Sequence, residues 1–275
     1  MKTFFMNDYG EGAHPIVMQR LLETNMEHTC GYGLDDYSLR AADVIREKCG
    51  QPGAAVHIMV GGTSANSIAI AAFLRPYEAA ICAPTGHINV HETGAVEATG
   101  HKVLPQPSTP DGKITAEQVE NAYLAHVNDA SFEHMVQPKL VYISLPTENG
   151  GLYSKAELTA LHDVCTRCGL YLFIDGARLG YGLTAPENDV ALADLCALSD
   201  VFYIGGTKCG ALFGEAVVIP DPALIPHFFT IVKQHGALFA KGRILGIQFD
   251  VLFTDDLYLH IGESALNYAD SVKNV

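Results

Sequence analysis

Runs of apolar residues alternate with amphipathic segments along most of this 275-residue chain. Most of the apolar runs lack the polar alternation of a half-exposed strand, which is typical of strands covered by helices on both faces. They predict strands at residues 55–60, 79–82, 102–105, 140–144, 171–174, 201–204 and 216–219. The amphipathic segments predict helices at residues 38–49, 64–74, 92–99, 116–126, 155–168 and 243–253. We therefore expect an α/β fold of three layers with a mostly parallel central sheet, whose carboxyl edge would hold the active site.

Three stretches of the chain differ in pattern. We expect an N-terminal segment with a glycine- and tyrosine-rich interface loop at residues 1–54, a large domain at 55–255, and the start of a truncated C-terminal domain at 256–275. No internal repeat, low-complexity segment or obvious linker separates them. The length suits one large domain, or one domain with a small lobe.

The charge balance argues against several classes of function. Asp and Glu number 31 against 17 Lys and Arg, which gives a formal net charge of −14. Nucleic acids and anionic membrane surfaces bind clustered positive charge, so we expect neither as a partner. No apolar stretch approaches the roughly 20 residues of a membrane span, and the N-terminal apolar run is too short for a secretory signal. We therefore expect a cytoplasmic protein.

The cysteines do not predict redox chemistry. Seven cysteines at irregular spacing argue against a disulfide framework. Cys165 and Cys168 have the spacing of a redox pair, but they end a helical pattern, whereas a redox pair needs a helix N-terminus to lower the thiol pKa. Two structural cysteines are the favoured interpretation.

A lysine and an aspartate follow two of the predicted strands. Asp175 ends the run at 171–174, and Lys208 comes just after the run at 201–204. A pyridoxal phosphate site needs this pair: the lysine forms a Schiff base with the cofactor, and the aspartate keeps the pyridine nitrogen protonated. The alternatives are a solvated surface lysine and an unrelated strand-end aspartate.

Small residues between a strand and a helix offer a place for the cofactor phosphate. The segment from Val60 to Asn66 reads Val-Gly-Gly-Thr-Ser-Ala-Asn, and its backbone N–H groups could approach an anion at the helix N-terminus. A tight turn with Thr63 or Ser64 as the helix cap explains the same residues.

Two histidines, His87 and His91, lie at spacing i, i+4 and resemble a zinc-binding helix. A zincin places glutamate directly after the first histidine, but here Ile88 stands there and Glu92 follows the second. We therefore expect no metal site. His87 could instead stack on an aromatic cofactor ring, or it could simply cap a helix.

Two further charged residues follow strands. Glu148, after the strand at 140–144, could act as a base or orient a water molecule, and the alternative is a turn formed by Glu-Asn-Gly-Gly. Arg178 could pair with the phenolate oxygen of the cofactor or with a substrate carboxylate, and the alternative is a structural ion pair.

With these segments in view, residues 7–255 resemble the threonine aldolases of the β-eliminating lyase group, which share the aspartate-aminotransferase-like fold (fold type I) of pyridoxal phosphate enzymes. The similar motifs are Gly-Tyr-Gly-Leu-Asp-Asp from Gly31, Gly-Gly-Thr-Ser-Ala-Asn from Gly61, Gly-His-Ile-Asn from Gly86, Pro-Thr-Glu-Asn-Gly from Pro146, Ile-Asp-Gly-Ala-Arg from Ile174 and Gly-Thr-Lys from Gly206.

The resemblance implies a role for each candidate residue. It implies a phosphate site at Gly62, Thr63, Ser64 and Thr207, with Arg243 contacting phosphate across a subunit interface. It implies ring contacts from His87, Asp175 and Arg178, covalent attachment at Lys208, and substrate contacts from Tyr9, Tyr32 and Arg178. The loop from Gly31 to Tyr37, which carries Tyr32, resembles one that reaches toward a neighbouring subunit's site. It implies catalytic roles for Lys208, His87, Glu148 and Asp175. Active sites shared in this way imply a homodimer or homotetramer.

The implied reaction is aldol cleavage of a β-hydroxy-α-amino acid, of the threonine or allo-threonine type, to glycine and an aldehyde. Another pyridoxal phosphate lyase, or a paralogue with weakened catalysis, is the alternative. Three departures matter: Glu148 stands where these aldolases often have a histidine, residues 6–11 replace an Arg-Ser-Asp-Thr-like signature, and the chain ends at Val275, short of the small C-terminal domain.

Overall fold

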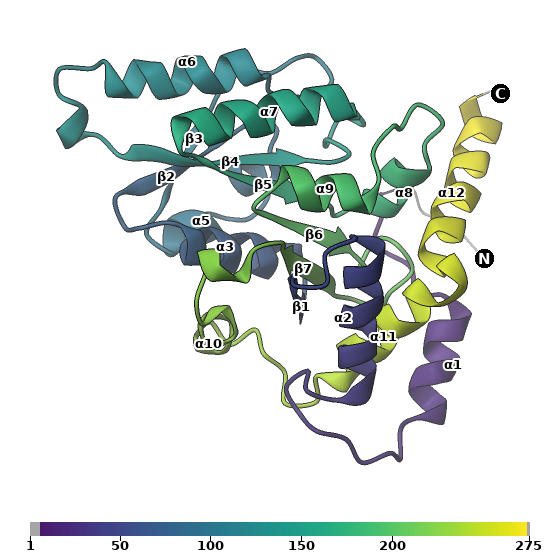
Figure 1. The fold of residues 1–275 in the computed structure, drawn as a ribbon. Coiled ribbons are helices and arrows are strands. Elements are labelled where there is room, and N and C mark those ends of the chain that lie inside the picture. Colours follow the sequence, from purple (N-terminus) through teal and green to yellow (C-terminus); the bar gives the residue numbers. More distant parts are fainter. Residues whose placement is uncertain (1–5, 274–275) are drawn as a thin grey trace.

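The computed structural model describes residues 6–273, and within them the chain forms a seven-stranded sheet (Figure 1). The strands are β1 (Ala55–Met59), β2 (Glu78–Cys82), β3 (Lys102–Pro105), β4 (Gln137–Ser144), β5 (Tyr171–Asp175), β6 (Val201–Gly205) and β7 (Glu215–Ile219). Their order across the sheet is β1-β7-β6-β5-β4-β2-β3. Strand β7 runs antiparallel to both of its neighbours, and the other pairs are parallel. The prediction of a mostly parallel sheet is confirmed.

Helices cover both faces of the sheet (Figure 1). Their bounds are α1 (Pro15–Glu23), α2 (Asp36–Lys48), α3 (Gly62–Phe73), α4 (His87–Val90), α5 (Ala95–Ala98), α6 (Ala116–Val127), α7 (Lys155–Cys168), α8 (Leu179–Thr184), α9 (Leu192–Leu198), α10 (Phe228–Gln234), α11 (Arg243–Phe253) and α12 (Leu257–Lys273). Short 3₁₀ turns lie at Phe132–His134, Pro222–Leu224 and Thr254–Asp256.

Alternate residues of each strand enter two separate apolar clusters. In β4, Val141 and Ile143 pack into the cluster that includes side chains of α7 and α9, while Leu140 and Tyr142 pack into the cluster that includes side chains of α3 and α10. Burial of one such aliphatic side chain stabilises the fold by about 1.5–3 kcal/mol. Because both sheet faces are buried, the strands show the continuous apolar runs that predicted them.

Capping residues set the ends of the long helices. Ser154 and Glu157 form a capping box at the start of α7, and Gly169 ends that helix in the left-handed conformation. Thr115 and Gln118 form the same arrangement at α6. Helix α3 differs, because no side chain caps its N-terminus at Gly61.

The predicted helix at 92–99 is confirmed only in its second half, where the single turn α5 lies. Between α5 and the earlier turn α4, Thr93 and Gly94 have φ angles of 54° and 73°. Positive φ angles end a right-handed helix, so the chain turns at this point. Glu92 is consequently buried, with 5% of its surface exposed, instead of lying on an exposed helical turn.

The two ends of the chain pack beside the sheet. Helices α1 and α2 lie against α11, and Arg40 pairs with Asp250 at 2.8 Å. Helix α12 lies along α8, so the predicted C-terminal stretch is helical from Leu257 to Lys273. Residues 1–5 and 274–275, parts of the predicted terminal segments and of the apolar run weighed as a signal, lie outside the described residues. Among residues 6–273, no helix combines the length and apolar character needed to cross a membrane.

Candidate active site

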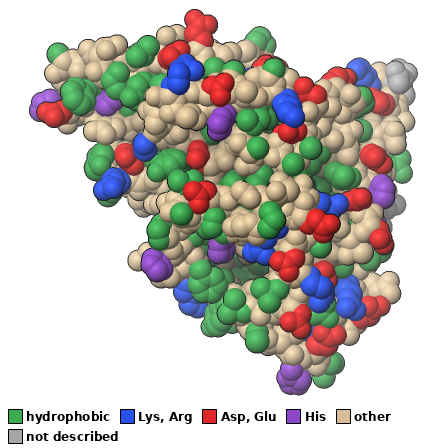
Figure 2. All heavy atoms as spheres, viewed as in Figure 1, with side chains coloured by type: hydrophobic (Ala, Val, Ile, Leu, Met, Phe, Trp, Pro, Cys, Tyr) green, Lys and Arg blue, Asp and Glu red, His purple; other side chains and the backbone are tan. Residues whose placement is uncertain are grey.

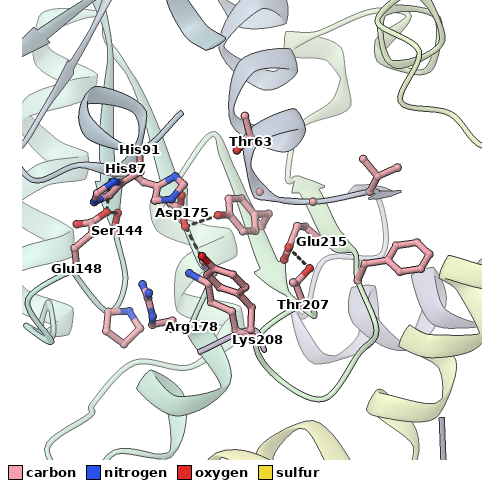
Figure 3. Close-up of a pocket in the computed structure, with 18 residues that line it drawn as sticks. Thr63, His87, His91, Ser144, Glu148, Asp175, Arg178, Thr207, Lys208 and Glu215 are labelled. Atoms are coloured by element: carbon pink, nitrogen blue, oxygen red, sulfur yellow. Dashed lines mark hydrogen bonds between the residues drawn. The ribbon is translucent and has the colours of Figure 1, made fainter. Parts of the chain in front are cut away.

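A cavity of about 370 Å³ opens at the carboxyl ends of β4, β5 and β6 (Figure 3). Its walls are formed by Tyr9, Val60, Gly61, Gly62, Thr63, His87, His91, Ser144, Pro146, Glu148, Asp175, Ala177, Arg178, Tyr203, Thr207, Lys208, Phe213 and Glu215. Most of the residues selected from the sequence meet here, at the edge of the sheet where the parallel topology places an active site.

Asp175 is held at the centre by several hydrogen-bond donors. Its two carboxylate oxygens accept from the Tyr203 hydroxyl at 2.5 Å, the Ala177 N–H at 2.9 Å, the Asn66 amide at 3.0 Å and the Tyr142 hydroxyl. The side chain is almost fully buried, and four donors stabilise a carboxylate in its ionised form. The backbone also approaches closely here, because any side chain at Gly176 would collide with the Tyr203 carbonyl.

The two tyrosines that donate to Asp175 keep their protons. Burial, and then the negative charge of Asp175, raise the pKa of the Tyr142 hydroxyl well above its usual value. The same two causes raise the pKa of the Tyr203 hydroxyl well above its usual value. Both hydroxyls are therefore fixed donors, and the carboxylate of Asp175 is oriented from two neighbouring strands.

A buried chain of polar groups connects Asp175 to His87. The Asn66 amide also donates to Glu92 Oε1 at 2.7 Å, and that oxygen lies 2.8 Å from His87 Nδ1. The hydrogen bond to Glu92 raises the pKa of the His87 imidazole above its usual value. Asn66 Oδ1 and Glu92 Oε2 are buried without a hydrogen-bond partner. His87 is thus held through Nδ1, and Nε2 is its remaining nitrogen.

Glu148 is tied to the same wall. Its Oε1 accepts from the Ser144 hydroxyl at 2.7 Å and from the His87 N–H at 3.0 Å. The carboxylate therefore sits at the N-terminus of the short turn α4. In Figure 3, His87 and Glu148 lie on one side of Asp175, and Thr207 and Glu215 lie on the other.

Lys208 and Arg178 bring positive charge to the mouth of the cavity. Arg178 Nε donates to Asp8 Oδ2 at 2.5 Å, and Lys208 Nζ lies 3.8 Å from Asp8 Oδ1. The turn that carries the lysine is fixed by a hydrogen bond from the Tyr181 hydroxyl to the Lys208 carbonyl. Both cations therefore face one carboxylate, so this corner of the cavity accepts an anionic group.

The first turn of α3 forms the opposite wall. Gly62 and Thr63 line the cavity, and a side chain at Gly62 would press on the Tyr203 hydroxyl. The first N–H groups of a helix have no partner within the helix, and no side chain caps them here. The wall therefore offers backbone donors to an anion.

Three of the predicted site residues do not line this cavity. The Ser64 hydroxyl donates to the Gly61 carbonyl at 2.8 Å and so stabilises the turn. Tyr32 lies under Lys233, whose Nζ is 4.2 Å from the ring centroid, and Arg243 donates to the Thr24 carbonyl at 2.6 Å and the Asn25 carbonyl at 3.0 Å. Since the resemblance implies that Tyr32 and Arg243 act across a subunit interface, a single chain does not test these two predictions.

The alternative chemistries find little support in the geometry. Within the described residues, no group of three or more His, Cys, Asp or Glu side chains is arranged to hold a metal ion. Cys165 and Cys168 are free thiols near the end of α7, and burial raises the pKa of both. A redox pair requires the opposite shift.

Besides Glu92, five residues at the site or in contact with it were not selected from the sequence. They are Asp8, Asn66, Tyr142, Tyr203 and Glu215. Asn66 lay at the end of the glycine-rich segment, and Glu215 was a charge opening an apolar run; both were available signals. The tyrosines sit inside apolar strands and resemble ordinary core residues.

Comparison with known proteins agrees with this geometry. The model of the family described as "Beta-eliminating lyase" matches residues 11–260. A low specificity L-threonine aldolase of Pseudomonas aeruginosa is 32% identical over 263 residues, which cover 95% of this chain and 74% of that protein. A threonine aldolase structure from Leishmania major is 48% identical with a TM-score of 0.94, covering 98% of this chain and 78% of that one.

The fold extends to more distant proteins. Aspartate aminotransferase of Thermus thermophilus has a TM-score of 0.73 at 15% identity, covering 94% of this chain and 67% of that one, so it shows the shared fold alone. Because the family model matches residues 11–260, which are most of this chain, the chain belongs to the β-eliminating lyase family.

Proposed function

We propose that the chain is a pyridoxal phosphate-dependent lyase that cleaves a β-hydroxy-α-amino acid, of the threonine or allo-threonine type, to glycine and an aldehyde. The observation that carries the proposal is the placement of Lys208 and a four-donor Asp175 in one cavity. The similarity to proteins named threonine aldolases supports the choice of reaction.

The residues present fit the cofactor. The uncapped first turn of α3, with Gly62 and Thr63, suits the phosphate, and the buried carboxylate of Asp175 suits a protonated ring nitrogen. His87 would contact the ring and Lys208 would hold the cofactor covalently. When bound, pyridoxal phosphate supplies an electron sink for negative charge at the substrate Cα.

Arg178 would bind the substrate carboxylate. Its guanidinium already holds the carboxylate of Asp8, which occupies this corner of the cavity together with Lys208. A substrate carboxylate would take the place of Asp8, and Tyr9, the next residue, would form the wall beside it. Charge-assisted pairing of this kind also fixes the orientation of the substrate.

His87 would remove the proton from the β-hydroxyl group. Aldol cleavage needs a base at this oxygen, and general base catalysis contributes about 10²–10⁴-fold. Because Nδ1 is held by Glu92, Nε2 is the nitrogen that can take a proton, and the raised pKa makes it a stronger base. Glu148, which accepts from Ser144 and the His87 backbone, would hold the short turn that carries His87.

A spectroscopic assay with two substrates tests the proposal. Purified protein mixed with pyridoxal phosphate should develop a visible absorbance band, and L-threonine or L-allo-threonine should then yield equal amounts of glycine and acetaldehyde. Pyruvate from L-serine without cleavage of either threonine isomer would assign β-elimination instead. A band with no turnover would indicate a paralogue with weakened catalysis.

Assembly and location are also part of the proposal. Exposed hydrophobic side chains line a pocket between α2, β1, α10 and α11, in the lower part of the molecule where hydrophobic side chains gather in Figure 2. They are Tyr32, Leu34, Leu39, Phe229 and Phe239. We expect this surface to be buried in a homodimer or homotetramer in the cytoplasm, with Tyr32 and Arg243 close to a partner's site. Light scattering of the purified protein measures the mass of the assembly.

A further inference from the structure

Glu215 is a second buried carboxylate of the cavity, and the proposed mechanism does not use it. It is the first residue of β7, pairs with Met59 of β1 and Gly205 of β6, and has 3% of its surface exposed. Since β1 leads directly into α3, Glu215 lies beside the strand that delivers the anion-binding turn. Figure 3 shows its carboxylate facing Thr207.

The hydrogen bonds around Glu215 depend on where one proton lies. Thr207 Oγ1 is 2.7 Å from Glu215 Oε1, and the Gly206 N–H donates to Oε2 at 3.0 Å. Thr207 Oγ1 also accepts from the Gly214 N–H at 3.0 Å. A threonine hydroxyl has a single proton to donate. With Glu215 ionised, that proton points at Glu215, and Thr207 has no donor left for a phosphate.

The surroundings of Glu215 favour the neutral acid. Burial is the largest cause, and with a smaller contribution from the negative charge of Asp175 it raises the pKa of Glu215 to about 8. The hydrogen bonds from Thr207 and Gly206, and to a lesser extent the charge of Lys208, act in the opposite direction. The other ionisable groups that face it are Tyr203 on β6, Cys209 in the following turn and Tyr258 on α12. From α11, the apolar side chains of Leu245 and Phe249 pack beside Gly214. Strand β1 offers the apolar Met59 opposite Glu215, with His57 two residues away, and the first turn of α3 carries no acidic residue.

We propose that Glu215 acts as a neutral acid in the loaded protein and orients Thr207 toward the cofactor phosphate. The carboxylic acid donates its O–H to Thr207 Oγ1, and Thr207 donates its own O–H to a phosphate oxygen. Thr207 Oγ1 then accepts two hydrogen bonds and donates one. When Glu215 starts ionised, binding takes up one proton from solvent, which forms the O–H bond of the acid. This proton uptake is separate from the covalent attachment at Lys208. The inference rests on the proposed function, because it needs the phosphate to lie at this wall.

Electrostatics favours the same state. An ionised Glu215 would place a negative charge beside the incoming phosphate, and like charges at close range in a buried site repel strongly. Protonation removes this repulsion and supplies a donor in the same step. Glu215 is thus a positioning residue for the phosphate site, acting through Thr207.

The test compares two ligands that differ only in the phosphate. The dissociation constants of pyridoxal phosphate and pyridoxal are measured from pH 7 to pH 9.5 for the wild type and Glu215→Gln, whose amide donates without titrating. For pyridoxal phosphate, the dissociation constant of the wild type divided by that of the variant should rise by about tenfold for each pH unit above the pKa of Glu215. For pyridoxal the ratio should stay flat. Equal pH dependence of both proteins toward pyridoxal phosphate would overturn the proposal.

Two further measurements keep the result interpretable. Calorimetry of the wild type near pH 9, in buffers of different ionisation enthalpy, should show about one more proton taken up with pyridoxal phosphate than with pyridoxal. In a Thr207→Ala background, Glu215→Gln should change the pH dependence less than in the wild type, because only the charge repulsion then remains. An undiminished change would contradict the role of Thr207. If neither ligand binds the wild type, the proposed function fails; if both bind without these differences, only the inference about Glu215 fails.

Discussion

Asp175 and Glu215 are two carboxylates of one cavity with the same 3% exposure, yet their surroundings differ. Asp175 accepts from four donors, among them two tyrosine hydroxyls. Glu215 accepts from a backbone N–H and a threonine hydroxyl. Burial alone does not decide the state of a carboxyl group, because hydrogen bonds to the ionised form offset the cost of removing it from water.

The difference gives the two ends of the cavity different chemistry. Asp175, which accepts hydrogen bonds from four donors, suits a partner that carries positive charge, such as a protonated ring nitrogen. Glu215, whose pKa is raised to about 8 mainly by burial, suits an anion that a neutral acid can approach. Substitutions from acid to amide at the two positions should therefore differ strongly in their effect on activity.

The largest expected effect follows from Asp175→Asn. The amide carries no charge and presents an NH₂ group to donors that require an acceptor, so we expect kcat/KM for threonine cleavage to fall by about 10²–10³-fold. The matched control is Glu215→Gln, which should keep activity within about tenfold at pH 7 because the amide reproduces the neutral acid. Steady-state kinetics of the two variants measures both. Equal losses at the two positions would contradict the assigned difference.

Removing donors from Asp175 should make its surroundings more like those of Glu215. Tyr142→Phe and Tyr203→Phe should each lower the free energy of unfolding by about 1.5–3 kcal/mol at pH 7, because each hydroxyl donates to a buried charged group. Urea unfolding monitored by circular dichroism measures the loss. Tyr123→Phe, in the partly buried helix α6 away from the cavity, is the control. A loss no greater than that of the control would show that the hydroxyls are not needed.

The stability of Glu215→Gln should change with pH in a defined direction. The pKa of Glu215 rises from its ordinary 4.5 to about 8 in the folded protein, so between these values the folded state binds a proton that the unfolded state lacks. Stability therefore falls with rising pH, by ~1.4 kcal/mol for each unit in this window. The variant lacks this contribution. The difference in free energy of unfolding, variant minus wild type, should therefore increase by about that amount from pH 6 to pH 7. A constant difference would place the Glu215 pKa outside this window.

The smallest effect concerns the link from Asp175 to His87. Glu92→Gln should lower the pKa of His87, because the hydrogen bond to Glu92 is the main cause of its elevation. A raised histidine pKa stabilises the fold below the ordinary value of 6.5 and loses this effect as pH rises through the folded value. The free energy of unfolding of the wild type should therefore exceed that of the variant most at acid pH, by ~1 kcal/mol. Titration of the His87 ring protons by NMR, with exposed His91 as a reference, checks the shift.

Much of this arrangement could be predicted from the sequence because its signals are local. Asp175 and Lys208 each follow an apolar run, and parallel strands bring such residues to one edge. Glu215 escaped prediction because β7 is antiparallel, so its first residue, and not its last, reaches that edge. The role of Glu92 was hidden by the positive φ angles of Thr93 and Gly94, which break the expected helix and turn its side chain inward.

The claim that Lys208 holds pyridoxal phosphate is tested most directly by chemical trapping. Protein incubated with pyridoxal phosphate is reduced with borohydride, digested and analysed by mass spectrometry, with Lys208→Ala and the exposed Lys102→Ala treated in parallel. We predict a single dominant pyridoxyl adduct on the peptide that contains Lys208, retained in Lys102→Ala and lost in Lys208→Ala. An adduct spread over surface lysines, or one that persists without Lys208, would contradict the account.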